Sequence, residues 1–337
     1  MLDRTMLEAV TRELFIPGLQ NQLYDEMPVL QRIVQNGVED AKGRALLDDV
    51  VLFKNAAKGR FQGYSYVITQ GNNLIVQATL NYANYYQSVS ISLEEEKQNT
   101  GTKEVLVKML EPKFEAARTG LKLDVNTDLY LALTSVSGKY TLVGMQAVCS
   151  TTNTYANINR ATAGNEGWQS NVDTTAITDE QLKDPAQGTK YMPTVLRRLW
   201  LKAAHDKYPS LGVLTKNLYE VWETIAETHN LQFGNEEANL GFGKAGLSAK
   251  SAQGRRVRLD IIWDSYCPAK AAFLLTPEDF KAFVFAGANF EGADVMGTGQ
   301  WQRGGNQLAA SMQIVWMGQI ICRVPREQAF ASALGDG

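Results

Sequence analysis

A glycine-rich segment, GFGKAG at residues 241–246, has the spacing that could bind a dinucleotide. A site of this kind needs a buried strand before the turn and a helix after it, so that the helix amides point at the pyrophosphate. The flanking sequences, NEEANL and LSAKSAQG, lack the hydrophobic pattern of either element. We therefore interpret the segment as a loop and expect no cofactor.

Cysteine and histidine could supply a nucleophile or a metal ligand, but their spacing favours neither. The three cysteines, Cys149, Cys267 and Cys322, are widely separated and lack a CxxC pair. This pattern argues against structural zinc and disulfides, and it indicates a reducing compartment. His205 and His229 lie outside any HExxH pattern, near the ends of predicted helices. A Cys267–His205 pair stays open as an alternative, because catalytic partners meet only in the fold. We expect no catalytic residue and no metal site.

Charged residues form two groups that could bind ions. The acidic run Glu94, Glu95 and Glu96 could hold a metal, pair with another subunit, or end a strand in solvent, which is the default for such a run. Its position at the base of an extended segment favours inter-subunit ion pairs. The basic residues at 255, 256 and 258 fit phosphate contacts or the edge of a strand. With 33 basic and 36 acidic residues, the chain lacks the basic excess of proteins that wrap nucleic acid.

The residues between 58 and 93 predict a long β-excursion. Residues 61–70 are rich in aromatic and β-branched side chains, 71–73 have turn chemistry, and 74–80 and 88–93 resume extended patterns. Tyrosine combines a large contact area with a polar hydroxyl, which suits contacts with another chain. The candidate inter-subunit contacts are the acidic run and five tyrosines: Tyr64, Tyr66, Tyr82, Tyr85 and Tyr86.

Helical periodicity predicts the elements that carry these segments. Apolar residues at steps of three and four over 103–133 predict a long helix, or two ordinary helices that meet at Pro112. Shorter helices are predicted over 2–15 and 191–208, and from 218 onward. We expect Trp200, Trp222 and Trp263 on apolar faces in the core.

Extended and loop patterns fill the C-terminal part of the chain. Residues 256–263 alternate as a half-buried strand, DSYCP at 264–268 is a turn, and 271–275 is a second strand. Thr276-Pro277-Glu278-Asp279 has the chemistry of a capped helix start. Residues 234–254 and 286–305 are predicted as Gly-rich loops. Segments 312–316 and 319–324 predict a hairpin or one kinked strand.

The order of these elements resembles the Hong Kong 97-type major capsid proteins of tailed bacteriophages. Segment 154–160 (TYANINR) with Trp168 is similar to a Tyr-small-small-Ile-x-Arg string of that family. Segments 213–219 and 318–326 are similar to its A-domain strand-helix segment and its closing segment, and 256–275 is similar to its passage between A and P domains. The resemblance covers about residues 50–330. It identifies the chain as a member of this family and predicts an α+β fold with no enzymatic activity.

The resemblance implies an organisation and a set of partners. It predicts an N-terminal arm (1–49), an E-loop (50–100), a P domain with a spine helix (101–190), a central α/β A domain (191–290) and returning P-domain strands with the C-terminus (291–337). It implies hexamers and pentamers of the chain that form an icosahedral shell around double-stranded DNA, assembled in the host bacterial cytoplasm, with a portal protein. The chain begins without a long charged helical extension, which indicates either a separate scaffolding protein or a chain that is already processed. The initiating Met1 favours a separate scaffolding protein.

Two other functions stay open from the sequence. An encapsulin-like compartment would use the same fold to enclose protein cargo, and the predicted helix over 2–15 fits a segment that lines its interior. An α/β enzyme would use the Gly-rich loop or the Cys267–His205 pair. No apolar run reaches the length that crosses a bilayer, and the N-terminus lacks the hydrophobic region of a secretory signal, so no membrane partner is expected.

Overall fold

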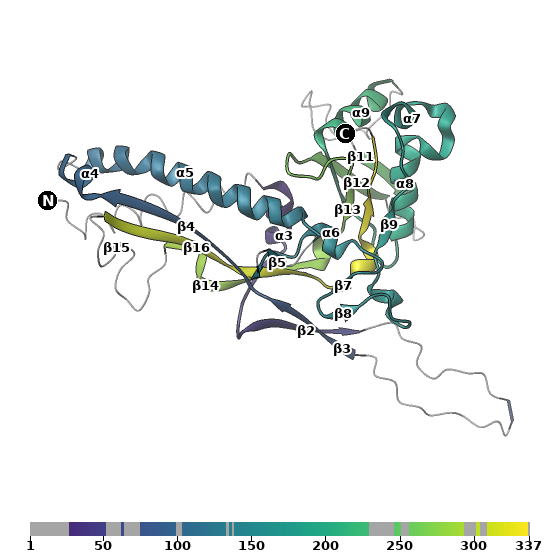
Figure 1. The fold of residues 1–337 in the computed structure, drawn as a ribbon. Helices are drawn as coiled ribbons and strands as arrows, with labels where there is room; N and C mark the ends of the chain where they lie inside the picture. The colour runs from purple at the N-terminus through teal and green to yellow at the C-terminus, as the bar shows by residue number, and fades with distance from the viewer. Residues whose placement is uncertain are drawn as a thin grey trace.

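Two β-sheets form the framework of the protein, and they are joined by two short chain crossings and by the longer passage between residues 92 and 171 (Figure 1). The structure, a computed structural model, describes residues 27–51, 62–63, 75–98, 103–132, 135–136, 138–228, 246–250, 256–292, 301–303 and 309–335. The predicted helix over 2–15, Tyr64, Tyr66, His229 and residues 241–245 of the Gly-rich motif lie outside these residues.

The first sheet is long and narrow. Its order is β1 (Val38–Asp40), β14 (Phe280–Gly292), β16 (Ala309–Cys322) and β15 (Gln302–Arg303), and β4 (Ala83–Ser92) pairs with β16 along its length. Gly318 in β16 has to be a glycine, because an added Cβ would lie 2.5 Å from the carbonyl oxygen of Phe283. The helix α3 (Pro28–Gln35) buries Val29, Leu30 and Ile33. The two C-terminal segments predicted at 312–316 and 319–324 fall mainly within one strand of 14 residues, β16, and do not form a hairpin.

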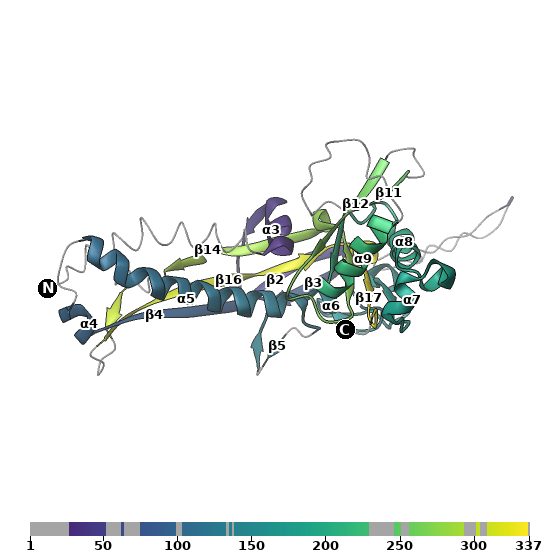
Figure 2. The ribbon, with the colours of Figure 1, turned by 90° about the horizontal axis from the view of Figure 1, so that it is seen from above.

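A single helix of 28 residues, α5 (Lys103–Tyr130), lies along the first sheet (Figures 1 and 2). Pro112 lies inside it, where it removes one backbone donor and favours a kink. Buried residues on both sides of Pro112, among them Leu110 and Phe114, offset this cost. The stripe predicted from the sequence is buried at Phe114, Ala117, Leu121, Val125 and Leu129, whereas its last member, Ala132, is exposed beyond the end of the helix. The interpretation as one long helix is confirmed.

The second sheet has the order β11 (Gly246–Lys250), β12 (Arg256–Trp263), β10 (Leu211–Leu214), β13 (Ala272–Leu275), β17 (Ala329–Ala331) and β9 (Asn171–Asp173). The helices α7 (Asp179–Lys183), α8 (Met192–Ala203) and α9 (Lys216–Thr228) lie with it in the compact lobe (Figure 1). The predicted helices at 191 and 218 and the strands at 212, 256 and 271 are confirmed within these bounds.

The remaining strands form three two-stranded pairs outside the two large sheets. The pairs are β2 (Ala45–Val51) with β3 (Ile75–Asn81), β5 (Ser135–Val136) with β6 (Lys139–Tyr140), and β7 (Thr154–Tyr155) with β8 (Ile158–Asn159). The remaining helices are α4 (Leu93–Gln98) and α6 (Met145–Val148), with 3-10 turns η2 (Glu166–Trp168), η3 (Pro185–Lys190), η4 (Pro277–Asp279) and η5 (Pro325–Glu327).

Local patterns misled three predictions. The helix expected after Thr276 is wrong: η4 has three residues and passes directly into β14, because Phe280, Ala282 and Val284 alternate into the core. The loop expected from 286 begins as the end of the same strand, which continues to Gly292. Trp263 is 46% exposed and does not join the core.

The predicted excursion also divides differently. Residues 83–92 form β4 and pair with β16 from Ala83↔Gly318 to Ser92↔Ala309, so they belong to the first sheet. The strands that leave the sheets are β2 and β3, which begin at Ala45 and end at Asn81. A strand in a sheet and a strand in a hairpin show the same alternation of apolar and polar residues. The sequence pattern therefore did not show that 75–81 and 83–92 belong to different sheets.

Candidate interaction surfaces

The strand β4 has one face toward α5 and one away from it. Val89 and Ile91 are buried, whereas Ser88 and Ser90 between them are exposed. Successive side chains of a strand point to opposite faces, so the alternation follows from the packing of α5 on one face. The predicted pattern of apolar and hydroxyl faces over 88–92 is therefore seen in the structure.

Two of the predicted contact tyrosines pack within their own chain. The hydroxyl of Tyr85 donates to Oδ2 of Asp128 at 2.7 Å and accepts from the backbone N–H of Leu142 at 2.9 Å. Burial is the main reason that the pKa of Tyr85 is raised. Tyr82 is buried, its hydroxyl donates to the carbonyl of Lys42 at 3.1 Å, and its ring meets the edge of Phe285. These side chains are used by the fold and leave little surface for a partner.

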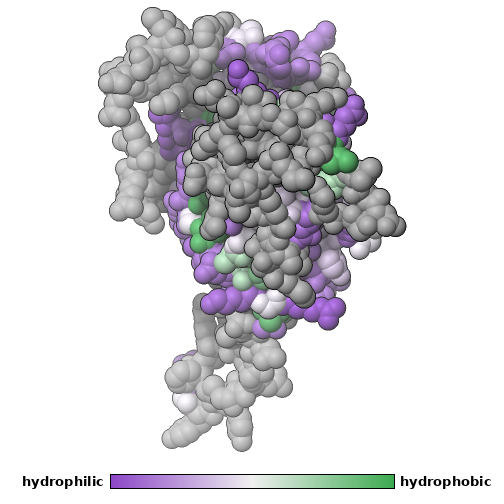
Figure 3. All heavy atoms as spheres, turned by 90° about the vertical axis from the view of Figure 1, so that its left-hand side faces the viewer, coloured by the Kyte–Doolittle hydropathy of each residue, from purple (hydrophilic) through white to green (hydrophobic). Residues whose placement is uncertain are grey.

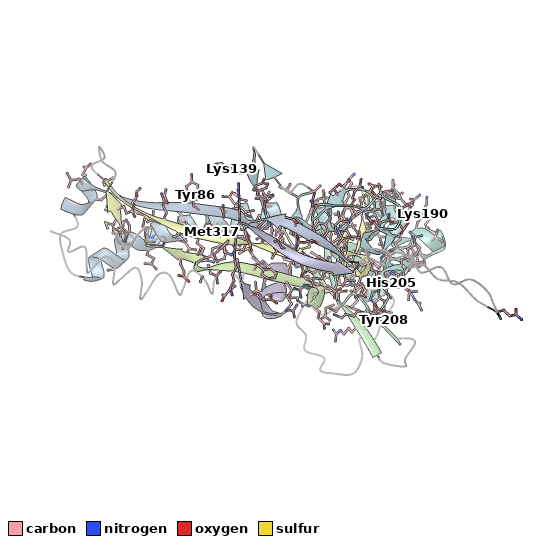
Figure 4. The ribbon with its side chains drawn as sticks, turned by 90° about the horizontal axis from the view of Figure 1, so that it is seen from below. Tyr86, Lys139, Lys190, His205, Tyr208 and Met317 are labelled. Atoms are coloured by element: carbon pink, nitrogen blue, oxygen red, sulfur yellow. The ribbon has the colours of Figure 1, made fainter. Side chains whose placement is uncertain are left out.

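Tyr86 is on the other face of the sheet and is 65% exposed. It lies directly opposite Val315 on β16, with Met317 two positions further along. Both of these side chains are half-buried. Tyr86 and Met317 are visible from the side opposite α5 (Figure 4). This face combines an exposed aromatic ring with apolar and small polar neighbours, which is a composition suited to contact with another protein.

The β2–β3 hairpin extends from the junction of the two lobes (Figure 1). Leu46 points inward and is 4% exposed, whereas the next residue, Leu47, is 57% exposed. The base is tied to the fold by Arg323, whose Nε lies 2.8 Å from Oδ2 of Asp48, and by the N–H of Thr79, which donates to the carbonyl of Ala156 at 2.9 Å. The hairpin is thus held at its base and offers an apolar side chain to solvent.

The acidic run lies at the far end of the first sheet and not at the base of the hairpin. Residues 94–96 are part of α4, so they do not end a strand. Oε2 of Glu95 accepts from Nζ of Lys113 at 2.7 Å and from the N–H of Ser92 at 2.9 Å. The Lys113 hydrogen bond is the largest cause of a lowered pKa at Glu95. Glu94 is exposed, and for Glu96 only the backbone is described.

Figure 3 views the end of the molecule that carries α4. The described residues that are visible in this view are mainly hydrophilic, with small separate hydrophobic patches. Glu95 has a partner within its own chain, Lys113. The use of this acidic run in contacts between subunits stays a prediction. Of the two residues whose side chains are described, Glu94 is the more exposed.

The segment 154–160 forms a buried cluster with Trp168. Tyr155 stacks on Trp168 with ring centroids 5.5 Å apart, and the guanidinium of Arg160 lies 4.8 Å from the centre of the Tyr155 ring. Arg160 is fully buried and donates to the carbonyls of Ala147 and Ser150. Burial lowers the pKa of Arg160. The string that carried the family resemblance is therefore a packing unit.

The thiols have little nucleophilic character. Cys149, Cys267 and Cys322 are free and buried. Burial raises the pKa of Cys149 to about 12 and raises those of the other two as well. Since the thiolate is the reactive form, these cysteines are poor nucleophiles at neutral pH. The thiol of Cys267 lies 3.8 Å from the carbonyl of Ala271, to which it donates.

The described part of the chain contains neither a metal-binding cluster nor a membrane-spanning helix. Within it, no three side chains of His, Cys, Asp or Glu gather in a way that could hold a metal ion. Its helices also include none with the length and apolar character that crossing a bilayer requires. His205 lies in the loop after α8, beside the point where the two lobes join (Figure 4).

Comparisons with known proteins bear on the fold. No family model matches the chain, and no curated protein matches its sequence. The chain is similar to the cyanophage A-1(L) capsid asymmetric unit, with a TM-score of 0.58 and 15% identity over 92% of this chain and 93% of the other. It is also similar to the capsid of Myoviridae phage XM1, with a TM-score of 0.51 and 9% identity over 89% and 91%. A structure from Mycobacterium phage Bobi gives 0.50 and 10% over 91% and 90%.

These similarities extend over nearly the whole of each chain, so they concern the complete architecture. The chain has the Hong Kong 97-type capsid fold, and the predicted α+β fold class is confirmed. A common fold at this level of identity does not by itself fix a function, because one fold can serve several.

Proposed function

We propose that this chain is the major capsid protein of a tailed bacteriophage. In this role, copies of the chain form hexamers and pentamers that close into an icosahedral shell around double-stranded DNA. The observation that supports it most is the match to phage capsid structures over about nine-tenths of both chains. The function is structural, and its chemistry is the association of protein surfaces.

The β2–β3 hairpin supports a role in assembly. An isolated two-stranded hairpin is marginally stable in water, and it needs further strands or a helix to cover its apolar face. Leu47 is 57% exposed on this hairpin, and Tyr86 is 65% exposed on the open face of the first sheet. We propose that the hairpin, with the predicted contacts Tyr64 and Tyr66 in its connection, packs on a neighbouring copy of the chain. Closed symmetry would then repeat this contact around the shell.

The remaining partners follow from the same proposal. The shell would assemble in the host bacterial cytoplasm, with a scaffolding protein and a portal protein supplied by other chains. The small net charge of −3 suits a shell that encloses DNA without wrapping it closely. The raised pKa values of the buried thiols also fit a role without covalent catalysis.

Electron microscopy of the expressed protein tests the proposal. We expect capsomers or closed particles, alone or with a scaffolding partner. A protein that stays monomeric at high concentration under both conditions would contradict it. Particles purified from the native source should contain DNA, and particles filled with one enzyme would instead indicate a cargo compartment.

A shortened variant separates assembly from folding. Replacing residues 53–73 with a Gly-Asn turn keeps β2 and β3 and removes the connection between them. We expect a cooperatively folded chain, measured by circular dichroism and thermal melting, that no longer forms particles. Normal particles would refute the proposed contact, and an unfolded chain would show that the connection stabilises the chain's own core.

A further inference from the structure

Four buried polar side chains lie where the two sheets are joined. One crossing is η4, between β13 and β14, and the other is η5, between β16 and β17. Thr276 and Asp279 from the first crossing, and Glu327 and Gln328 from the second, are at most 5% exposed. A change in the bonds of this cluster acts directly on the connection between the sheets.

Hydrogen bonds tie the crossings to each other. The backbone N–H of Thr276 donates to Oε1 of Gln328 at 2.8 Å, and its hydroxyl donates to the carbonyl of Glu327 at 3.2 Å. The side-chain amide of Gln328 donates to Oδ2 of Asp279 at 3.2 Å. The backbone N–H of Arg323 donates to the carbonyl of Asp279 at 2.9 Å.

The loop after α8 contributes one cation and two amides. Nζ of Lys207 lies 3.1 Å from Oδ1 of Asp279 and 3.3 Å from Oε2 of Glu278. The backbone N–H groups of Asp206 and Lys207 donate to Oε1 of Glu327. The other carboxyl oxygen of Glu327, Oε2, is buried and has no hydrogen-bond partner among the described residues. The Lys207 side chain is 47% exposed, so the buried carboxyl of Asp279 is paired with a partly solvated lysine.

Other charged or titratable groups surround this cluster. Asp206 pairs with Arg326, Arg323 pairs with Asp48, and Arg32 of α3 pairs with Asp260. The thiol of Cys322 and the carboxyl of Glu166 are on elements packed against η4 and η5. The ion pairs engage the arginines with other acids, which leaves Lys207 as the cation whose contacts with Asp279 are described.

Of the two buried carboxyls, Asp279 is the one whose surroundings favour its protonated form. Burial is the main reason that the pKa of Asp279 is raised to about 7, and the charge of Glu327 raises it against the opposing effect of Lys207. Adjacent buried carboxyls ionise together only at a large cost. A protonated Asp279 can donate to Glu327, whose Oε2 is without a partner.

We propose that the buried carboxyl of Asp279, in a cluster with Gln328, Lys207 and Glu327, binds a proton and acts as a proton-dependent latch between the two sheets. With the proton bound, the carboxyls join η4 to η5. Without it, two buried negative charges face each other and the junction loosens. The inference concerns the folded chain and does not depend on the proposed role in a shell.

The sign of the pH dependence follows from proton binding. The pKa of Asp279 in the folded state, about 7, is above its ordinary value of 3.8. Between these values the folded chain binds more protons than the unfolded chain, so stability falls as pH rises from about 4 to about 7. The latch is closed while Asp279 is protonated, below about pH 7, and it is open above that pH.

Hydrogen exchange of the junction tests the latch. In the wild type, exchange of peptides covering 276–280 and 323–329 should be on the order of tenfold faster at pH 8 than at pH 6, after correction for intrinsic rates. Asp279→Asn places an uncharged donor at the same position and should remove this excess. Glu278→Gln is the matched control, because Glu278 contacts the same lysine but its side chain is 68% exposed. It should behave like the wild type.

A second variant tests the proposal if Asp279→Asn does not fold. Glu327→Gln also removes one of the two charges and should abolish the excess exchange if Asp279→Asn does not fold. Infrared spectra of the wild type should show a protonated carboxyl at pH 6 that is lost by pH 8 and is absent from the variants. Equal pH dependence in the wild type and both variants, or the absence of that band, would overturn the proposal. Because these readouts use the folded chain, a failure to form particles would not affect them.

Discussion

Two hairpins of this protein differ in how far their apolar side chains are buried within the chain. The β7–β8 hairpin is short and buries Tyr155 between Trp168 and Arg160. The hydroxyl of Tyr155 also accepts from the backbone N–H of Cys322 at 2.7 Å, which ties the hairpin to the end of β16. The β2–β3 hairpin is longer, yet it leaves Leu47 largely exposed and is held mainly at its base.

The difference shows which contacts are complete within one chain. The short hairpin has a stacking partner, a buried cation and a backbone anchor, so its fold is self-sufficient. The long hairpin has paired backbones, but its apolar side chain Leu47 is largely exposed. A further contact is needed to bury this side chain. Mutations in the first should therefore act on folding, and mutations of exposed side chains in the second on assembly.

The largest effect is expected from Trp168→Ala in the short hairpin's partner. Trp168 is 1% exposed, stacks on Tyr155, and donates from its ring nitrogen to the carbonyl of that residue. Its loss should lower the free energy of unfolding by about 3–5 kcal/mol. Chemical denaturation followed by circular dichroism measures this. Trp263→Ala is the control, because Trp263 is 46% exposed, and it should change stability by no more than about 0.5 kcal/mol.

A smaller effect is expected at the turn of the same hairpin. Ala156 and Asn157 both have positive φ, 50° and 64°, as a two-residue I′ turn requires. A β-branched side chain is strained in this region, so Asn157→Val should cost about 1–2 kcal/mol of the free energy of unfolding. Asn157→Gly removes the strain and should stay close to the wild type. Similar stabilities for the two variants in urea denaturation would contradict the turn assignment.

The sequence was most informative where a pattern repeats along one element. The stripe of α5 from Phe114 onward continues over about five turns, and this repetition predicts a helix. Whether the helix continues through Pro112 was decided only by the structure. The segment with Tyr155 and Arg160, followed by Trp168, also stood out in the sequence, but only because it is similar to a segment of the capsid family. The physical reason for it, a cation and two stacked rings, became visible only in the fold.

The sequence was least informative where distant segments meet. Alternation over 88–92 predicts a strand, but not its partner. That partner is β16, more than 200 residues away, so the strand was wrongly assigned to the predicted excursion. The acids after Thr276 were interpreted as a helix start, whereas Asp279 is buried beside Glu327 and Lys207 from other parts of the chain. Pairings of this kind leave no local signal.

The last prediction compares two neighbouring residues on β2. Leu47 is 57% exposed, so Leu47→Ser removes little packing from the isolated chain and should change the free energy of unfolding by no more than about 0.5 kcal/mol. If the hairpin packs on an adjacent copy, however, the serine places a polar group in that contact. Thermal melting should then be unchanged while electron microscopy shows few or no particles.

Leu46→Ser is the matched control, because it makes the same chemical change on the opposite face of the same strand. Leu46 is 4% exposed within its own chain, so its loss should cost about 2–5 kcal/mol in stability. Burial in the chain and burial between chains thus predict opposite readouts at adjacent positions. Particles of normal number and shape from Leu47→Ser would mean that this face of β2 stays in solvent after assembly, and the contact would then have to involve the connection between β2 and β3 instead.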